Sequence, residues 1–273
     1  KENLKPLKKF KNFYFKKHDI EKPLSIEVSK IFNLACPASP NLYQKNPIKT
    51  LKTNFNGVLN ILDLAKKNNA TVFQASTSEI YGDPTQHPQK ENYFGNVNTM
   101  GKRSCYDEGK RVAEALFHYY LTNYKLKIKV ARIFNTYGPN MLVRDGRVIS
   151  NFINQAINND DITIYGDGNQ TRSFCYIDDL IIGIDNFINS KKSITGPLNL
   201  GNPKEYSIKN IAKKIIKLTE SKSKIIYKNK PQDDPVKRKP DISKAKKELS
   251  FNPKTSLNEG LLKTIKYFKH IKE

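Results

Sequence analysis

Short β-like stretches alternate with amphipathic helical stretches along almost the whole chain, and this alternation limits the possible fold more than any other feature. Two segments, 47–67 and 105–125, carry apolar side chains at helical spacing. The stretches that read as strands include "NFYFKKHDI", "KIFNLA", "ATVFQAS", "IKVARIF", "ITIYG" and "LNLG". Strands that alternate with helices form a parallel sheet covered by helices. The sequence therefore predicts an α/β fold with a doubly wound parallel sheet.

The texture of the sequence changes near Gly138, after "NTYGP", and this change indicates a boundary between two domains. We expect one domain over residues 1–137 and a second, smaller α/β domain over residues 138–273. Some segments of the second half are expected to cross back to the sheet of the first.

The formal net charge of +22 raises the alternative of a basic nucleic-acid-binding protein. Only seven of the 48 basic residues are arginines, and the lysines are scattered over nearly every segment. Dispersed lysines are typical of a solvated surface, so we expect no nucleic-acid partner. Arg147, Arg172 and Arg238 carry more information, because each lies in a motif-like stretch and arginine binds phosphate or carboxylate in a bidentate manner.

The sequence has no apolar run long enough to span a membrane and no segment typical of a signal peptide. The three cysteines, Cys36, Cys105 and Cys175, are widely spaced and do not follow a zinc-ligand pattern. We therefore expect a soluble, cytoplasmic protein with reduced thiols, no metal site and no membrane partner.

Tyr106 and Lys110 form a Y-x-x-x-K pair one turn apart on the expected helix 105–125. An ammonium group beside a phenol favours the phenolate, so we expect Lys110 to lower the pKa of Tyr106 and make it a general base. The same spacing also arises by chance in lysine-rich helices. Thr77 supports the chemical interpretation, because it ends a predicted strand at the sheet edge where ligands bind.

Three ordered motifs, "STSEIYGD", "YDEGK" and "RIFNTYGP", are similar to those of the extended short-chain dehydrogenase/reductases that act on nucleotide sugars. Further motifs resemble the UDP-glucuronate decarboxylases, or UDP-xylose synthases: "LACPASP", "SCYDEGKRVAE", "YGDGNQTRSFCYIDDL", "NLGNP" and "DDPVKRKPDI". The similarity runs from about His18 onward. It implies a Rossmann-like sheet, a C-terminal substrate-binding domain, bound NAD and a UDP-sugar substrate. It also implies a homodimer formed by the helices around 48–67 and 105–124.

The resemblance also assigns roles in catalysis. Tyr106 would take the proton from the sugar 4-hydroxyl, Lys110 would hold the nicotinamide ribose, and Thr77 would hydrogen-bond the reacting oxygen. Oxidation at C4 would make the C6 carboxylate that of a β-keto acid, which loses carbon dioxide. Reprotonation at C5 and return of the hydride would give UDP-xylose. The other catalytic residues would be Ser78 and Glu79 around C5 and Arg238 near the carboxylate.

Two further sets of residues follow from the resemblance alone. The cofactor-binding residues would be Asp19, Ile20, Leu34, Ala35, Thr53 and Ala75, together with Tyr106 and Lys110. The residues that bind the UDP-sugar would be Lys52, Asn60, Asn135, Arg147, Tyr165, Gln170 and Arg172.

The glycine-rich turn that holds a pyrophosphate in dinucleotide-binding sheets does not occur in this sequence. The resemblance begins after the first strand, glycine loop, first helix and second strand of the family pattern, so we expect an N-terminally truncated sheet. Three alternatives to an active decarboxylase stay open: a nucleotide-sugar dehydratase or epimerase, a catalytically inactive fragment, and the nucleic-acid-binding protein. Ser78 favours the decarboxylase, because related dehydratases carry an aspartate there.

Overall fold

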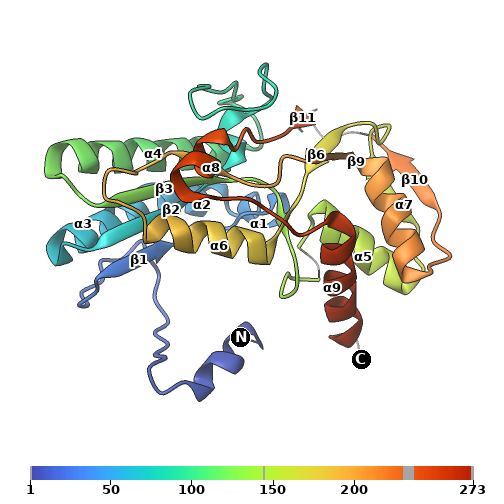
Figure 1. Ribbon diagram of the computed structural model, residues 1–273, viewed down its shortest axis with the longest axis horizontal. Helices are drawn as coiled ribbons and strands as arrows, with labels where there is room; N and C mark the ends of the chain where they lie inside the picture. The colour runs from blue at the N-terminus through green and yellow to red at the C-terminus, as the bar shows by residue number, and fades with distance from the viewer. Residues whose placement is uncertain (1, 144, 230–236, 272–273) are drawn as a thin grey trace.

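The computed structural model describes residues 2–143, 145–229 and 237–271. A four-stranded parallel sheet with strand order β1-β2-β3-β8 forms the centre of the first lobe (Figure 1). Its strands are β1 (Lys30–Asn33), β2 (Thr71–Thr77), β3 (Ile128–Ile133) and β8 (Leu198–Leu200). The predicted α/β class with a parallel sheet is confirmed.

Helices cover both faces of this sheet, because successive side chains of each strand point to opposite faces. Val72 packs with buried side chains of α3 (Val58–Asn68) and α4 (Ser104–Tyr124). Its neighbour Phe73 packs on the other side, with α6 (Ile177–Ile188) and α8 (Ser243–Leu249) (Figure 1). The β2 strand is therefore buried on both faces, as the apolar run "ATVFQAS" predicts.

The predicted helix over 47–67 forms in three consecutive pieces: α2 (Pro47–Lys52), the π-helical turn η3 (Thr53–Gly57) and α3. The side chain of Asn46 caps the start by accepting a hydrogen bond from the Lys49 amide at 3.0 Å. Asn69 ends α3 in the left-handed conformation with a φ of 49°.

A second lobe holds its own apolar core, formed by α5 (Val148–Asn158), α7 (Ile208–Thr219), α9 (Leu257–His270) and short strands. Parallel strands β5 (Ile162–Tyr165) and β10 (Ile225–Lys228) form one pair. A three-stranded sheet combines β11 (Lys237–Arg238), β6 (Thr171–Ser173) and β9 (Glu205–Ser207). The remaining elements are β4 (Thr136–Tyr137), β7 (Cys175–Tyr176), the helix α1 (Pro40–Tyr43) and the 3-10 turns η1 (Glu2–Leu4), η2 (Pro6–Lys9) and η4 (Ser78–Tyr81).

The lobes do not divide the chain at a single point. The α6, β8 and α8 elements come after Gly138 in the sequence, yet they pack on or pair with the first sheet (Figure 1). The polypeptide therefore crosses between the lobes more than once.

The strand expected over residues 12–20 is wrong. This segment has no strand conformation and leads from an N-terminal extension that stands away from the body (Figure 1). Tyr14 and Phe15 are exposed, and in the described part of the chain β1 pairs only with β2. An extended segment without a paired neighbour is not stable as a strand.

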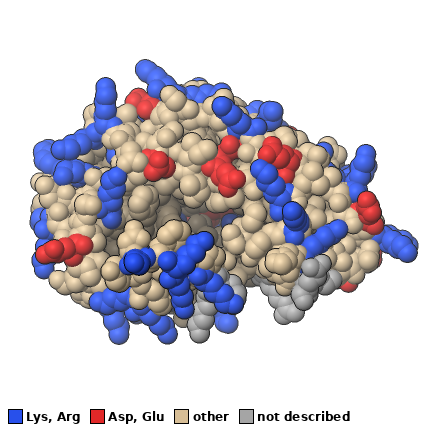
Figure 2. All heavy atoms as spheres, turned by 60° about the horizontal axis from the view of Figure 1, so that its bottom comes forward, with Lys and Arg blue, Asp and Glu red and all other residues tan. Residues whose placement is uncertain are grey.

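On the face in Figure 2, Lys and Arg side chains spread over the surface around a central hollow, with few acidic residues among them. Within the described residues no helix is long and apolar enough to cross a membrane, and no group of His, Cys, Asp and Glu side chains is placed to hold a metal. The three cysteines are free.

Truncation of Phe73 tests the central position of β2. We expect Phe73→Ala to lower the free energy of unfolding by about 3–5 kcal/mol, because the ring is fully buried between Phe32 and Phe187. The matched control Phe94→Ala removes a ring that is 87% exposed and should change stability by less than about 0.5 kcal/mol. Urea unfolding measures both, and equal losses would contradict the assignment of β2 to the core.

Candidate active site

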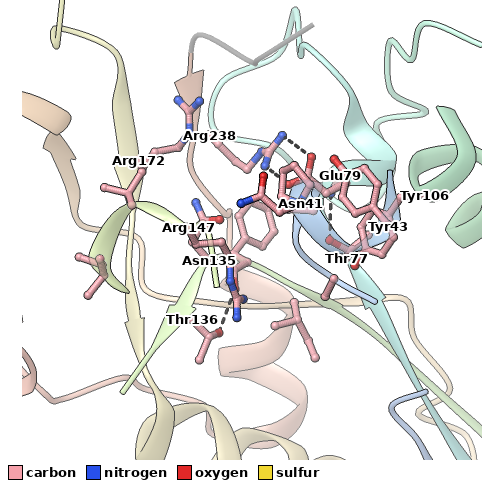
Figure 3. Close-up of a pocket in the computed structure, with 18 of the residues that line it drawn as sticks. Asn41, Tyr43, Thr77, Glu79, Tyr106, Asn135, Thr136, Arg147, Arg172 and Arg238 are labelled. Atoms are coloured by element: carbon pink, nitrogen blue, oxygen red, sulfur yellow. Dashed lines mark hydrogen bonds and ion pairs between the residues drawn. The ribbon is translucent and has the colours of Figure 1, made fainter. Parts of the chain in front are cut away.

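A pocket of about 570 Å³ lies between the two lobes, at the C-terminal ends of β2 and β3. In Figure 3, Thr77, Glu79, Tyr106 and Tyr43 gather on one side, whereas Arg147 and Arg172 lie on the other. The parallel strands end at the same edge of the sheet, which brings residues from distant segments together. The predicted residues that line this pocket are Leu34, Ala75, Thr77, Ser78, Glu79, Tyr106, Lys110, Asn135, Arg147, Tyr165, Gln170, Arg172 and Arg238.

The motif "STSE" forms the turn where β2 ends and η4 begins. Thr77 has extended backbone angles, and its Oγ1 accepts a hydrogen bond from the Glu79 amide at 3.2 Å. This cap starts the 3-10 turn and directs Ser78 and Glu79 into the pocket. Gly82 ends the turn with a φ of 63°, where an added Cβ would meet the Asn96 backbone oxygen.

Glu79 is held between two arginine side chains. Arg238 donates through both terminal nitrogens to its two carboxylate oxygens, and Arg103 donates to Oε2. Burial alone would raise the pKa of Glu79, but the two guanidinium groups outweigh it and hold the pKa at about 2. Glu79 is therefore an anion at neutral pH.

The segment that carries Arg238 is fixed by Gln89, a fully buried side chain. The Lys239 amide donates to Gln89 Oε1 at 2.8 Å, and the Gln89 amide donates to the Lys239 carbonyl at 2.9 Å. Strand β11 also pairs with β6, where Arg238 lies opposite Arg172. These contacts bring Arg238, from the C-terminal part of the chain, to the end of β2.

Tyr106 and Lys110 lie on the first turns of α4, as predicted, but both are buried, which was not predicted, and their electrostatics differ from expectation. Lys110 Nζ donates to the Ala75 carbonyl at 2.9 Å and lies 5.8 Å from the Tyr106 ring centroid. Burial raises the pKa of Tyr106, with contributions from Cys36 and Glu79, and a hydrogen bond with Thr77 opposes them. Burial also lowers the pKa of Lys110. The expectation of a lowered Tyr106 pKa is wrong for this structure, because desolvation disfavours the phenolate.

The opposite side of the pocket is rich in groups that bind anions and nucleotides. Arg147 pairs with Asp145, and the buried Arg172 donates to the Thr171 carbonyl at 2.9 Å. Gln170 Nε2 donates to the Tyr165 carbonyl at 2.6 Å. Two guanidinium groups across from Tyr106 suit a diphosphate.

Six other residues proposed for binding do not line the pocket. Asp19 pairs with Lys49 at an exposed site, Asn60 Nδ2 donates to the Ile20 carbonyl at 2.8 Å, and Thr53 Oγ1 donates to Glu21. These contacts dock the segment around Ile20 on α2 and α3. The binding roles of this set stay predictions: Asp19, Ile20, Ala35, Lys52, Thr53 and Asn60.

Three residues of the pocket region escaped the sequence interpretation. The Tyr43 ring stacks on Tyr106 with centroids 4.9 Å apart and an interplanar angle of 6°. Arg103 Nε lies 3.7 Å from Asp107 Oδ2. Arg103 immediately precedes α4 and Asp107 lies in its first turn, beside Tyr106; this proximity to Tyr106 is the only signal in the sequence that points to them. No sequence signal points to Tyr43.

Asp107 is buried, and its Oδ1 has no hydrogen-bond partner in the described parts of the chain. Burial and the neighbouring Glu79 carboxylate raise the pKa of Asp107 to about 7, against the attraction of Arg103. A carboxyl group in this state is partly protonated near neutral pH.

Comparison with known proteins shows the family of this chain. The family model described as GDP-mannose 4,6 dehydratase matches residues 2–264. The UDP-glucuronic acid decarboxylase 3 of Arabidopsis thaliana is 50% identical over 261 residues, which cover 96% of this chain and 76% of that relative. The chain therefore belongs to the family that this model describes.

In the chain's own "DDPVKRKPDI" motif, the first four residues, 233–236, lie outside the described residues.

Other members of the family differ from this chain in length or in sequence. The UDP-glucuronic acid decarboxylase 1 of Xenopus tropicalis is 52% identical over 94% of this chain, which spans only 61% of that relative. Among solved structures, the UDP-glucuronic acid 4-epimerase of Bacillus cereus, in complex with UDP-glucuronic acid and NAD, has a TM-score of 0.89 at 27% identity. The match covers 99% of this chain and 86% of the epimerase. The Rossmann-like fold of the family is confirmed.

The pKa of Asp107 predicts a pH-dependent stability. Because its folded-state pKa lies above the ordinary value of 3.8, the group favours the folded state at low pH and opposes it as pH rises toward 7. The difference between 3.8 and about 7 corresponds to about 4 kcal/mol at most. We therefore expect Asp107→Asn to be more stable than the parent at pH 8, with a difference that shrinks toward pH 4.

Urea unfolding of both proteins across this range measures the effect. Glu108→Gln is the matched control, because Glu108 is the next residue of α4 and its side chain is 35% exposed. A difference between Asp107→Asn and the parent that does not change with pH would contradict the prediction.

Proposed function

We propose that this chain carries the active site of a UDP-glucuronate decarboxylase, which converts UDP-glucuronate into UDP-xylose and carbon dioxide. The observation that supports this most is the pocket itself, where Thr77, Tyr106 and Lys110 lie beside a largely buried Glu79–Arg238 pair. The first group suits oxidation of a sugar hydroxyl, and the second suits a substrate that carries a carboxylate. Relatives that are 49–52% identical in sequence are named UDP-glucuronic acid decarboxylases.

We infer that NAD is the cofactor. The described residues fit its nicotinamide end: Lys110 supplies an ammonium group, and Leu34 offers exposed apolar surface at the end of β1. Bound NAD supplies an acceptor for the C4 hydride and later returns it. A glycine turn for the pyrophosphate does not occur among the described residues.

The side chains on the Thr77 side of the pocket accept the proton of the sugar 4-hydroxyl and orient its oxygen. Tyr106 receives this proton, and Thr77, which hydrogen-bonds the phenol, orients the sugar oxygen. The stacked Tyr43 ring limits the freedom of Tyr106 and keeps water from its other face. The Tyr106 phenol must lose its own proton before it can act as a base. A Lys110 ammonium group held close to the phenolate oxygen would favour that loss.

Loss of carbon dioxide follows from the 4-ketone. The C5–C6 bond breaks, its electrons pass into an enolate that the ketone stabilises, and a proton then adds at C5. Arg238 orients the carboxylate before it leaves, and Ser78 and Glu79 surround C5. On the other side, Arg147 and Arg172 hold the diphosphate.

An epimerase is the second candidate, because structures of UDP-glucuronic acid 4-epimerase superpose closely on this chain. The two reactions share oxidation at C4 and differ in whether carbon dioxide leaves. The identity of the product therefore separates them.

We expect the chain, supplied with UDP-glucuronate and NAD, to release UDP-xylose, which mass spectrometry of the products detects. Tyr106→Phe should slow the reaction by about 10²–10⁴-fold, because the base is lost while the stacked ring stays. The control Tyr119→Phe removes a hydroxyl from an exposed ring on the same helix and should leave the rate unchanged. A uronic acid epimer in place of UDP-xylose would favour the epimerase.

We further propose a reducing cytoplasmic location, which suits three free thiols.

We also propose a homodimer formed by α2, η3 and α4. The supporting observation is a group of exposed apolar side chains on these packed elements: Ile48, Leu51, Phe55 and Tyr119. Ile48→Glu should convert a dimer into a monomer in light scattering, because it buries a charge at the interface. The control Ile182→Glu, on exposed α6 surface, should leave the mass unchanged. A parent that is already monomeric would rule out the dimer.

A further inference from the structure

Glu205 is not among the described residues that line the pocket, yet it contacts three segments that lead to it. Its Oε1 accepts a hydrogen bond from Thr171 Oγ1 at 2.7 Å. Its Oε2 lies 3.0 Å from His87 Nε2 and 3.6 Å from Lys239 Nζ. Thr171 begins β6, Lys239 follows β11, and His87 belongs to the loop after η4. One carboxylate therefore joins two strands and a loop.

Glu205 is an anion at neutral pH. Burial alone would raise its pKa, but the hydrogen bonds of Thr171 and His87 and the nearby Lys239 ammonium outweigh burial and lower the pKa below the ordinary value of 4.5. A carboxylate only accepts hydrogen bonds, so Thr171 and His87 both donate to it. The side chain is only 20% exposed. The carboxylate thus holds the three segments through charge-assisted contacts that are largely shielded from solvent.

The sheet β11-β6-β9 has two faces, and Glu205 lies on the face away from the pocket. Arg172 of β6 pairs with Arg238 of β11, so both side chains point to one face, and both line the pocket. Thr171 and Ser173 flank Arg172 in β6, so they point to the other face. Glu205 is the β9 partner of Ser173 and shares that face. It therefore holds the back of the sheet whose front carries two pocket arginines.

The strands of this sheet are too short to fix their own register firmly. Strand β11 has two residues, and β6 and β9 have three each. A slip of one residue would turn Arg172 or Arg238 away from the pocket. Side-chain contacts strengthen the pairing: Gln89 holds the backbone of Lys239, and Glu205 attracts the Lys239 ammonium group. The placement of the two arginines thus depends on groups behind the sheet.

We propose that Glu205 is a positioning residue, which fixes β6 against β11 so that Arg172 and Arg238 meet the UDP-sugar together. This inference rests on the proposed function, which assigns Arg172 to the diphosphate and Arg238 to the sugar. Glu205 itself does not touch the substrate. It acts through Thr171 and Lys239, the chain neighbours of the two arginines.

The kinetics of UDP-glucuronate decarboxylation by Glu205→Ala test the proposal. We expect KM to rise about 10-fold, the lower end of the range for one hydrogen bond to a charged group. The kcat should change by less than about threefold, because the proposed chemistry at C4 takes place on β2 and α4, in the first lobe. Glu205→Gln keeps an oxygen that accepts from Thr171 and should give a KM between those of the parent and Glu205→Ala.

Calorimetric titration with UDP repeats the test without turnover, because UDP keeps the diphosphate and lacks the sugar. We expect Glu205→Ala to weaken UDP binding by about 10-fold as well, through the displaced Arg172. Glu248→Ala is the matched control, because it removes the same side chain from an exposed position of α8. It should leave KM, kcat and the UDP affinity unchanged.

A lower kcat at an unchanged KM would assign Glu205 a structural role and overturn the inference, because a smaller folded fraction reduces the number of active sites and not the affinity of each. Unchanged kinetics and UDP affinity would overturn it as well. Both results leave the proposed function intact. A parent that binds UDP but forms no UDP-xylose would overturn the proposed function alone, and the UDP titration then decides whether Glu205 positions Arg172. A parent that does not bind UDP would overturn both.

Discussion

The carboxylate of Glu79, held between Arg103 and Arg238, is the interaction on which the candidate site depends. It joins the end of β2, the start of α4 and strand β11, although Glu79 and Arg238 are 159 residues apart in the chain. The group is largely buried, so loss of both arginines would leave an uncompensated charge, at a cost of about 3–5 kcal/mol. This ionic contact therefore connects the two lobes and lies within the pocket between them.

The rest of the fold serves to bring these three segments to one point. Parallel pairing of β1, β2, β3 and β8 places their C-terminal ends at one edge, and burial on both faces keeps β2 in register. Below the site, Arg132 of β3 forms a bidentate pair with Glu114 of α4, which also accepts a hydrogen bond from Ser76. The helix that carries Tyr106 is thus fixed to the strand that carries Thr77.

Periodicity predicted most of the secondary structure correctly, because amphipathic spacing and apolar runs are local properties. The helix over 47–67, strand β2 and the long helix α4 all form where expected. The segment 12–20 has an equally suitable composition, yet it forms no strand, since a strand also needs a paired neighbour. Spacing likewise predicted that Tyr106 and Lys110 share a face, but it could not predict their burial, which reverses the expected direction of the Tyr106 pKa.

The sequence by itself determined the class of fold, the order of the motifs and the family, because these depend on residue types and on distances along the chain. It also identified Thr77, Glu79, Tyr106 and Arg238 as candidates for one site. Only the tertiary structure decided which side chains pair there. Arg103 and Tyr43 joined the cluster through contacts between distant segments, whereas Asp107 joined it through a contact one helical turn away, with Arg103. Pairing and pKa depend on separation in space and on exclusion of water, and neither quantity is written in the local sequence.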